Sequence, residues 1–211
     1  MTPIWGNAMK IIEARSAPNP RRVRIFLAEK GITVPFEQCE FTVSALKSAE
    51  FTAQNPMQRV PVLILDDGTA ISESIAICRY FEEVSPEPAL FGRGAVGRAI
   101  VEMWNRRMEL GLLFQVSQVF RHLHPSMAEL EVPQVASWGE ANRPKVLETL
   151  RILDEQLGCH RFVAGDEYSV ADITALVAID FMKPARIARP DGLNNVTRWH
   201  EEVSRRASAR A

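Results

Sequence analysis

Apolar and polar positions alternate in two different ways along the chain, and the change divides it into two parts. Over the first 84 residues, short apolar runs typical of strands are interleaved with segments of helical periodicity. We predict strands at 10–13, 34–40, 62–65 and 70–71, and helices at 21–30, 44–53 and from 73 to about 84. The order is therefore strand, helix, strand, helix, strand, strand, helix, which is typical of an α/β domain.

A segment rich in proline and glycine follows this part, and beyond it the periodicity is helical throughout. One amphipathic stretch runs from 95 to about 123, where a His-Pro pair interrupts it, and a second runs from 142 to 157. The expected organisation is an α/β domain at 1–84, a linker at 85–93 and an all-helical domain at 94–211.

Ser169 and Asp172 mark the start of one helix in the second domain. They are three residues apart, the spacing of a capping box in which the Asp172 carboxylate accepts a hydrogen bond from the N–H of Ser169. Tyr168 and Ile173 are placed to pack as the accompanying hydrophobic staple. The role expected for Asp172 is therefore in folding rather than in catalysis.

Composition and charge limit the classes of function. A formal net charge of −1 gives no general attraction to nucleic acid or to an anionic membrane. No apolar run approaches the roughly 18 residues that a membrane span requires, and the amino terminus lacks a signal-peptide pattern. The 3 cysteines are widely spaced and form no Cys-x-x-Cys pair, which fits a reducing compartment. We expect a soluble, cytoplasmic protein with neither a nucleic-acid nor a membrane partner.

The remaining cysteines and histidines suggest no metal site. Cys78 lies in the apolar stripe of its helix and Cys39 ends a strand-like stretch, so both are interpreted as buried structural thiols. His122 and His124 are two positions apart on an expected helix, a spacing that does not direct both rings at one ion. The other histidines have no ligand partners nearby in the sequence.

Two short motifs carry the candidate chemistry of the first domain. Because proline cannot donate to a sheet ladder, Pro61 of Val60-Pro61 should mark a strand start or an edge whose free backbone groups face something else, such as a ligand. Glu73-Ser74 stands where a helix begins, and free N–H groups and the helix dipole favour an anion there. The alternative for the second motif is ordinary capping by Ser72 or Ser74.

Joined at this spacing, the two motifs resemble the amino-terminal domain of the glutathione transferases, and the capping box resembles that of their helical domain. The resemblance covers nearly the whole chain except the first eight residues, which we interpret as a flexible or cloning-derived extension. It implies a thioredoxin-like α/β domain followed by an all-α helical bundle. It also implies glutathione as co-substrate and a homodimer.

The resemblance assigns a glutathione-binding role to both motifs. Pro61 follows a cis peptide bond in the family, and the backbone of Val60 would pair with the cysteinyl unit of glutathione by strand addition. The carboxylate of Glu73 would bind the ammonium of the γ-glutamyl group. The hydroxyl and N–H of Ser74 would bind its carboxylate.

Three further residues are assigned to the glutathione site by the same resemblance. Lys47 would bind the glycine carboxylate, and Gln58 or Arg59 would lie beside the backbone of Val60. Solvated surface charge is the alternative for Lys47 and Arg59.

The loop at 14–20, just before the first helix, is where the family activates the glutathione sulfur. A thiol of pKa about 8.5 needs about 2.7 kcal/mol of preferential anion stabilisation for a fall of about two units. One hydrogen bond to a charged group contributes about 1.5–3 kcal/mol and a helix amino terminus about 0.3–1, so a single hydroxyl or amide would suffice. The loop has neither Tyr nor Cys, which leaves Ser16 and Asn19. Helix capping, with Pro20 at the first helical position, is the alternative for Asn19.

The resemblance places an electrophile pocket between the two domains, lined by Trp104, Arg107, Met108 and Gly111. These residues could equally belong to the core or to a dimer interface, and the core is favoured for Trp104. Conjugation of glutathione to small electrophiles is the leading function, and glutathione-dependent reduction of disulfides or peroxides is a close second. A non-enzymatic scaffold for protein binding is the third alternative, but it has no need of a γ-glutamyl pocket.

Overall fold

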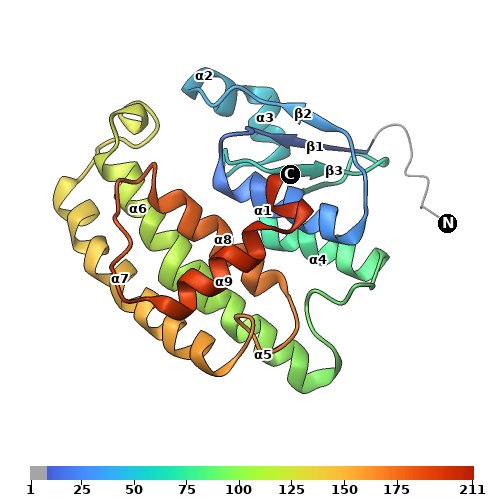
Figure 1. The fold of residues 1–211 in the computed structure, drawn as a ribbon. Coiled ribbons are helices and arrows are strands. Elements are labelled where there is room, and N and C mark those ends of the chain that lie inside the picture. Colours follow the sequence, from blue (N-terminus) through green and yellow to red (C-terminus); the bar gives the residue numbers. More distant parts are fainter. Residues whose placement is uncertain (1–8) are drawn as a thin grey trace. The chain divides into compact units, whose positions relative to one another are not determined.

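The computed structural model describes residues 9–211, and the expected extension at 1–8 lies outside this range. The chain forms two compact units, the first ending at Pro88 and the second running from Ala89 to Arg210 (Figure 1). The first is a mixed α/β unit and the second is helical, as the sequence predicts. No helix within the described residues is both long and apolar enough to cross a membrane.

The first unit is built on a four-stranded sheet with strand order β2-β1-β3-β4. Its strands are β1 (Lys10–Glu13), β2 (Phe36–Gln38), β3 (Val62–Ile64) and β4 (Ala70–Ser72). β1 pairs in parallel with β2 and antiparallel with β3, and β3 pairs antiparallel with β4. The helices of this unit are α1 (Pro18–Lys30), α2 (Val43–Leu46), α3 (Ala49–Gln54) and α4 (Ser74–Val84). Figure 1 shows α1 and α4 on one face of the sheet.

Helix α1 begins three residues before the predicted start at 21. Pro18 occupies its first position, where the N–H that proline lacks would have no helical partner in any case. Gly31 ends the helix in the left-handed conformation, with φ of 65°, as a carboxy-terminal cap should. The end of the helix was therefore predicted correctly and its start was wrong.

The segment predicted as one helix at 44–53 forms two short helices, α2 and α3, because two hydroxyl side chains each start a new one. Thr42 Oγ1 accepts from the N–H of Ala45 at 3.3 Å, which caps α2. Ser48 Oγ accepts from the N–H of Phe51 at 3.1 Å, which caps α3. The second predicted strand, at 34–40, is likewise shorter in the structure and retains only the three residues of β2.

Lys30 ties the end of α1 to the end of the first unit. Its Nζ lies 2.5 Å from Glu82 Oε2 and donates to the carbonyl oxygens of Ser85, at 2.8 Å, and Pro88, at 2.6 Å. The side chain is completely buried. An ammonium group has three donors, and here each has an acceptor, which compensates for the burial of the charge.

The two cysteines of the first unit differ in burial. Cys78 is fully buried on α4, so the prediction of a buried structural thiol is confirmed, and burial raises the pKa of the thiol to about 12. Cys39 is only half-buried, and the prediction of a buried thiol was wrong there. It follows the last residue of β2, the edge strand of the sheet, whose three residues are all exposed.

The helical unit begins with one continuous helical stretch. It comprises α5 (Gly94–Arg106), the π-helix η1 (Arg107–Leu113) and α6 (Phe114–Leu123). The remaining elements are η2 (Pro125–Met127), α7 (Ala136–Cys159), α8 (Val170–Met182), α9 (Asn194–Ser204) and η3 (Ala207–Arg210). The stretch predicted at 95–123 is therefore helical throughout, but its middle is a π-helix, and α7 extends beyond the predicted 142–157.

The capping box at the start of α8 is present as predicted. The Asp172 carboxylate is fully buried and accepts from the N–H of Ser169 at 2.9 Å, from the N–H of Val163 at 2.9 Å and from Trp199 Nε1 at 2.8 Å. Burial raises the pKa of Asp172 to about 6, against the opposing effect of these hydrogen bonds. Asp172 therefore joins α8 to α9 and to the loop before α8, which is a structural role.

Candidate functional site

Strand pairing brings the two sequence motifs of the first unit together. β3 and β4 are antiparallel, and Val62 at the start of β3 is paired with Ser72 at the end of β4. Val60-Pro61 leads directly into Val62, and Glu73-Ser74 leads directly away from Ser72. Both motifs therefore leave the sheet at the same end, although 12 positions separate Pro61 from Glu73 in the sequence.

Pro61 marks a strand start, as the sequence predicts, because β3 begins at the next residue. The Val60–Pro61 peptide bond is cis. Val60 is only 6% exposed, yet within residues 9–211 neither its N–H nor its carbonyl has a hydrogen-bond partner. Buried backbone groups are almost always paired, so this stretch of main chain is available for a ligand.

Asn55 organises the loop that leads to Val60, a role that the sequence analysis did not find. Its Nδ2 donates to the carbonyl of Arg59 at 2.7 Å, and its Oδ1 accepts from the N–H of Met57 at 3.0 Å. The side chain is 1% exposed. The Asn-Pro pair at 55–56 is a turn signal that could have pointed to this residue.

Glu73 and Ser74 occupy the start of α4 in an unusual backbone conformation. Glu73 is the residue before the helix and has φ of 71° and ψ of 115°, a region that residues other than glycine seldom adopt. The first helical bond of α4 joins the N–H of Ile77 to the Glu73 carbonyl, so the N–H groups of residues 74–76 have no helical acceptor. Strained backbone of this kind is often found at binding sites.

The side chains of this motif do not cap the helix. Ser74 is 4% exposed, whereas Glu73 is exposed to solvent. Across the described residues, neither Ser72 nor Ser74 makes a capping hydrogen bond, so the capping alternative has no support. A carboxylate and a hydroxyl thus stand beside three free amides, which can receive a ligand that carries both an ammonium and a carboxylate.

Ser16 and Asn19 lie at the junction of β1 and α1, and both are exposed. The capping residue of α1 is Ala17 and Asn19 lies within the first helical turn, so the capping alternative for Asn19 was wrong. Since Pro18 and Pro20 have no N–H, the first three positions of this helix offer one backbone donor, that of Asn19. The side-chain oxygen of Asn19 accepts from Arg22 Nη1 at 3.3 Å.

A buried ion pair anchors this loop, and the sequence analysis did not find it. Glu13 at the end of β1 is 1% exposed and pairs with Arg24 of α1. Arg24 Nη2 donates to the carbonyl of Arg15 at 3.0 Å, while Gln38 Oε1 accepts from the N–H of Arg15 at 3.2 Å. Gln38 Nε2 in turn donates to Glu13 Oε1 at 2.7 Å. Both backbone polar groups of the residue before Ser16 are therefore held by side chains.

The other residues predicted for the glutathione site lie on two separate segments. Gln58 and Arg59 belong to the loop before Val60; Gln58 Nε2 donates to Thr52 Oγ1 at 3.2 Å, and the Arg59 side chain is exposed. Lys47 follows α2 and is also exposed, without an ion pair among residues 9–211. The roles of these three residues stay predictions.

The residues predicted for an electrophile pocket all lie on α5 and η1. Trp104 and Met108 are buried in the helical unit, as the core alternative for Trp104 expects. The Arg107 guanidinium lies over the Trp104 ring, 4.6 Å from its centroid, and the Gly111 carbonyl accepts from Thr149 Oγ1 at 2.9 Å. Arg107, which is exposed, is the member of the set most available to a substrate. Their role in binding stays a prediction.

Metal-ligating side chains do not gather in the described part of the chain. Within residues 9–211, no group of three or more His, Cys, Asp or Glu side chains is arranged to hold a metal ion.

Comparison with known proteins agrees with this architecture. The amino-terminal and carboxy-terminal domain models of the glutathione S-transferases match residues 17–84 and 104–207. Glutathione S-transferase 2 of Saccharomyces cerevisiae is 35% identical over 205 residues, which are 96% of this chain and 88% of that protein. The chain therefore belongs to the glutathione S-transferase family, whose enzymes use glutathione as co-substrate.

Solved structures give the same result. A glutathione S-transferase domain-containing protein of Marinobacter aquaeolei VT8 is 38% identical with a TM-score of 0.92, over 94% of this chain and 98% of that one. A glutathione S-transferase of class Gtt2 from Vibrio parahaemolyticus is 37% identical with a TM-score of 0.83, over 94% of each chain. The fold predicted from the sequence is thus the fold of this enzyme family.

Proposed function

We propose that the first unit binds glutathione through Val60, Glu73 and Ser74 and that the enzyme conjugates it, as the thiolate, to small electrophiles. The backbone of Val60 pairs with the cysteinyl unit in the manner of an added strand. Glu73 binds the γ-glutamyl ammonium, and Ser74 with the amides of α4 binds the neighbouring carboxylate.

The observation that carries this proposal is the arrangement of unpaired backbone groups at one end of the sheet. Val60 is buried with a free N–H and carbonyl just before β3, and the three free amides of α4 come just after β4, the strand that pairs with β3. A peptide-like ligand with a charged amino-acid end satisfies both sets at once. Glutathione is such a ligand, because its γ-glutamyl group carries an α-amino acid beside an ordinary cysteinyl residue.

Activation of the sulfur is assigned to the loop between β1 and α1. The Ser16 hydroxyl, the Asn19 side chain and the Asn19 N–H are the candidate donors, and the ion pair of Glu13 with Arg24 fixes the loop that carries them. A hydrogen bond to the thiolate contributes about 1.5–3 kcal/mol, enough to lower the thiol pKa by about one to two units. No general base is needed for this step.

Reduction of disulfides or peroxides with glutathione is the second candidate. It is favoured by the presence of Asn19, and the absence of cysteine, in the loop at 14–20. Both reactions begin with the same bound thiolate, so they share the glutathione site. They differ in the group that the sulfur attacks, which is an electrophilic carbon in conjugation and a disulfide or peroxide in reduction.

We further propose a homodimer, in which the apolar stripe of the helical unit is covered by a second copy. Exposed apolar side chains recur along one helical stretch of α5, η1 and α6, at Val96, Ile100, Met103, Leu110 and Phe114. On α5 the spacing of Val96, Ile100 and Met103 places these three on one face, and Leu110 and Phe114 continue the series of exposed apolar residues along η1 and α6. Exposed apolar side chains gathered along one helical stretch mark an interaction site.

Thermal unfolding with reduced and oxidised glutathione tests the binding site. At a concentration near 100 times Kd, the ligand should stabilise the protein by about 2.7 kcal/mol, which corresponds to a shift of several degrees. Glu73→Gln should abolish the shift, whereas Glu83→Gln, which changes an exposed carboxylate of the same helix, should keep it. A folded protein that shows no shift with either form would favour the scaffold instead. Assays with an aromatic electrophile and with a mixed disulfide then separate the two reactions.

A further inference from the structure

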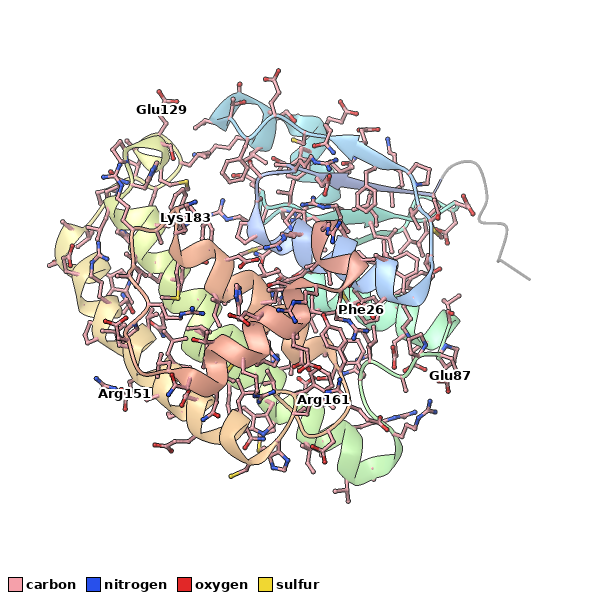
Figure 2. All side chains as sticks on the ribbon, in the orientation of Figure 1. Phe26, Glu87, Glu129, Arg151, Arg161 and Lys183 are labelled. Atoms are coloured by element: carbon pink, nitrogen blue, oxygen red, sulfur yellow. The ribbon has the colours of Figure 1, made fainter. Side chains whose placement is uncertain are left out.

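Helix α1 carries an arginine on its buried face. Arg22 is 2% exposed, and Phe26, which lies one turn later on the same face, is fully buried. Phe26 is labelled in Figure 2. A charged side chain seldom occupies such a position unless its donors are paired, so the partners of the Arg22 guanidinium bear on its role.

One partner of this guanidinium is the side chain of Asn19. Arg22 Nη1 donates to Asn19 Oδ1 at 3.3 Å. The two residues are three positions apart, a spacing at which side chains of one helix meet. Because Asn19 is exposed and Arg22 is buried, the bond ties a residue at the open start of α1 to a group held in the interior.

The bond determines which end of the Asn19 amide is free. A guanidinium has donors only, so the amide atom that faces it has to be the oxygen. The nitrogen is then directed away from Arg22, and within residues 9–211 Asn19 Nδ2 has no acceptor. Asn19 therefore presents two N–H donors, rather than an acceptor, at the exposed start of α1.

The charge of Arg22 supports the same arrangement. Burial raises the pKa of the Cys78 thiol to about 12, and the positive charge of Arg22 opposes that rise. The field of the guanidinium thus reaches a thiol on α4, beyond its own helix. A cation bonded to an amide oxygen also polarises the amide, which strengthens its N–H groups as donors.

We propose that Arg22 is a positioning residue, which holds the oxygen of Asn19 and thereby directs the Nδ2 donors at the glutathione sulfur. This inference rests on the proposed function, in which the loop between β1 and α1 activates that sulfur. Asn19 Nδ2 then adds a hydrogen bond to the thiolate beside those of the Ser16 hydroxyl and the Asn19 N–H. Without Arg22 the amide can rotate and present its oxygen, which repels a thiolate.

The test is the pKa of glutathione bound to each variant, measured from the pH dependence of thiolate absorbance in the saturated complex. Arg22→Met removes the guanidinium, Asn19→Ala removes the amide, and a double variant removes both. Arg22→Met should raise the pKa of bound glutathione by about 0.5, with a fall of about threefold in kcat/KM. The same substitution should have no further effect in the Asn19→Ala background, because Arg22 acts through the amide.

Two further variants make the test specific. Arg21→Met removes a cation from the same helical turn, and as the control it should leave the pKa of bound glutathione unchanged. Asn19→Asp keeps an oxygen for Arg22 but replaces the donors with a second, charged oxygen, so it should raise this pKa more than Asn19→Ala does. Since Asn19 is exposed, Asn19→Asp tests the proposal even if Arg22→Met does not fold.

An equal rise with Arg22→Met in both backgrounds would show that Arg22 acts without Asn19 and would overturn the proposal. An unchanged pKa of bound glutathione in Asn19→Asp would overturn it as well. Calorimetric titration with glutathione distinguishes these outcomes from a failure of the proposed function. A wild type that binds no glutathione would overturn both, whereas normal binding with unchanged pKa values in the variants would overturn the role of Arg22 alone.

Discussion

The side-chain amide of Asn55 holds the carbonyl of Arg59 at 2.7 Å, one residue before the backbone proposed to meet glutathione. The same side chain accepts from the N–H of Met57, so a single buried amide fixes both ends of the turn. The free backbone groups of Val60 therefore depend on a residue that need not touch the ligand.

Replacement of Asn55 should affect binding and stability together. Asn55→Ala leaves the Arg59 carbonyl and the Met57 N–H without their partner, so we expect a loss of about 1–3 kcal/mol in the free energy of unfolding. Glutathione affinity should fall about tenfold because the loop is no longer fixed. Calorimetric titration and urea unfolding measure the two effects. Met57→Ala, which truncates an exposed side chain of the same loop, is the control; equal affinity of both variants would show that Asn55 does not position the site.

Substitutions of Ser16 and Asn19 should show which of the two residues donates the hydrogen bond to the glutathione sulfur. Ser16→Ala removes the only hydroxyl of the loop at 14–20, and we expect the pKa of bound glutathione to rise by about one unit or more, with a fall of about tenfold in kcat/KM. Asn19→Ala keeps the backbone N–H of Asn19, so its effect should be smaller. The pH dependence of thiolate absorbance in each complex measures the pKa directly. The reverse order of effects would assign the sulfur to the Asn19 side chain.

The buried pair of Glu13 and Arg24 should be far more important than the exposed pair on the same sheet. Arg24→Met leaves the Glu13 carboxylate buried without its cation, and we expect a loss of about 3 kcal/mol or more in the free energy of unfolding. Glu37→Gln, which removes the exposed pair of Lys10 and Glu37, should change it by less than about 0.5 kcal/mol. Urea unfolding of both variants decides the matter. Comparable losses would mean that the Glu13 carboxylate is rescued by solvent or by Gln38.

Asp172 should make the stability of the helical unit fall, rather than rise, as the pH increases from about 4 to 6. Its pKa of about 6 in the folded protein lies above the unfolded value, so the folded state binds more protons between about pH 4 and 6. The stability that this group contributes is complete below about pH 4 and is lost, by about 3 kcal/mol, as the pH rises through 6. The measurement is the difference in unfolding free energy between wild type and Asp172→Asn over this range. Glu167→Gln, an exposed acid nearby, is the control, and a flat difference would contradict the prediction.

The proposed dimer predicts that one charge in the apolar stripe separates the subunits. Leu110→Glu places a carboxylate in the middle of the stripe, and burial of an unpaired charge should weaken association by several kcal/mol. Sedimentation velocity at micromolar concentration should show monomers for this variant. Ile152→Glu, at an exposed apolar position of α7, should leave the dimer intact. A monomeric wild type would disprove the assignment.

The elements that periodicity predicts well are those in which local sequence and packing agree. β1 was placed to the residue, and the end of α4 falls at Val84, near where it was predicted, because each has a clear apolar face and a clear boundary. The start of α1 was missed because two prolines read as a loop, although proline fits the first turn of a helix. The break between α2 and α3 depends on Ser48, whose capping role competes with an apolar pattern that continues across it.

The candidate site was predictable where a motif is contiguous and hidden where partners are distant. Val60-Pro61 and Glu73-Ser74 are short, contiguous motifs, so their resemblance to those of the family can be seen in the sequence. Glu13 and Gln38 are 25 positions apart and meet only because β1 and β2 pair in one register. The π-helix η1 was not predicted, because no residue pattern within it distinguishes a π-helix from an ordinary α-helix.

The position of Lys30 sets where the first unit can be cut for study alone. A fragment that stops at Val84, where the predicted first domain stops, discards the carbonyls of Ser85 and Pro88 and leaves a buried ammonium with Glu82 as its one remaining acceptor. A fragment that continues to Pro88 keeps every one of these contacts. The four residues beyond α4 therefore belong to the folded first unit rather than to a flexible linker, and a fragment made to study this unit alone should include them.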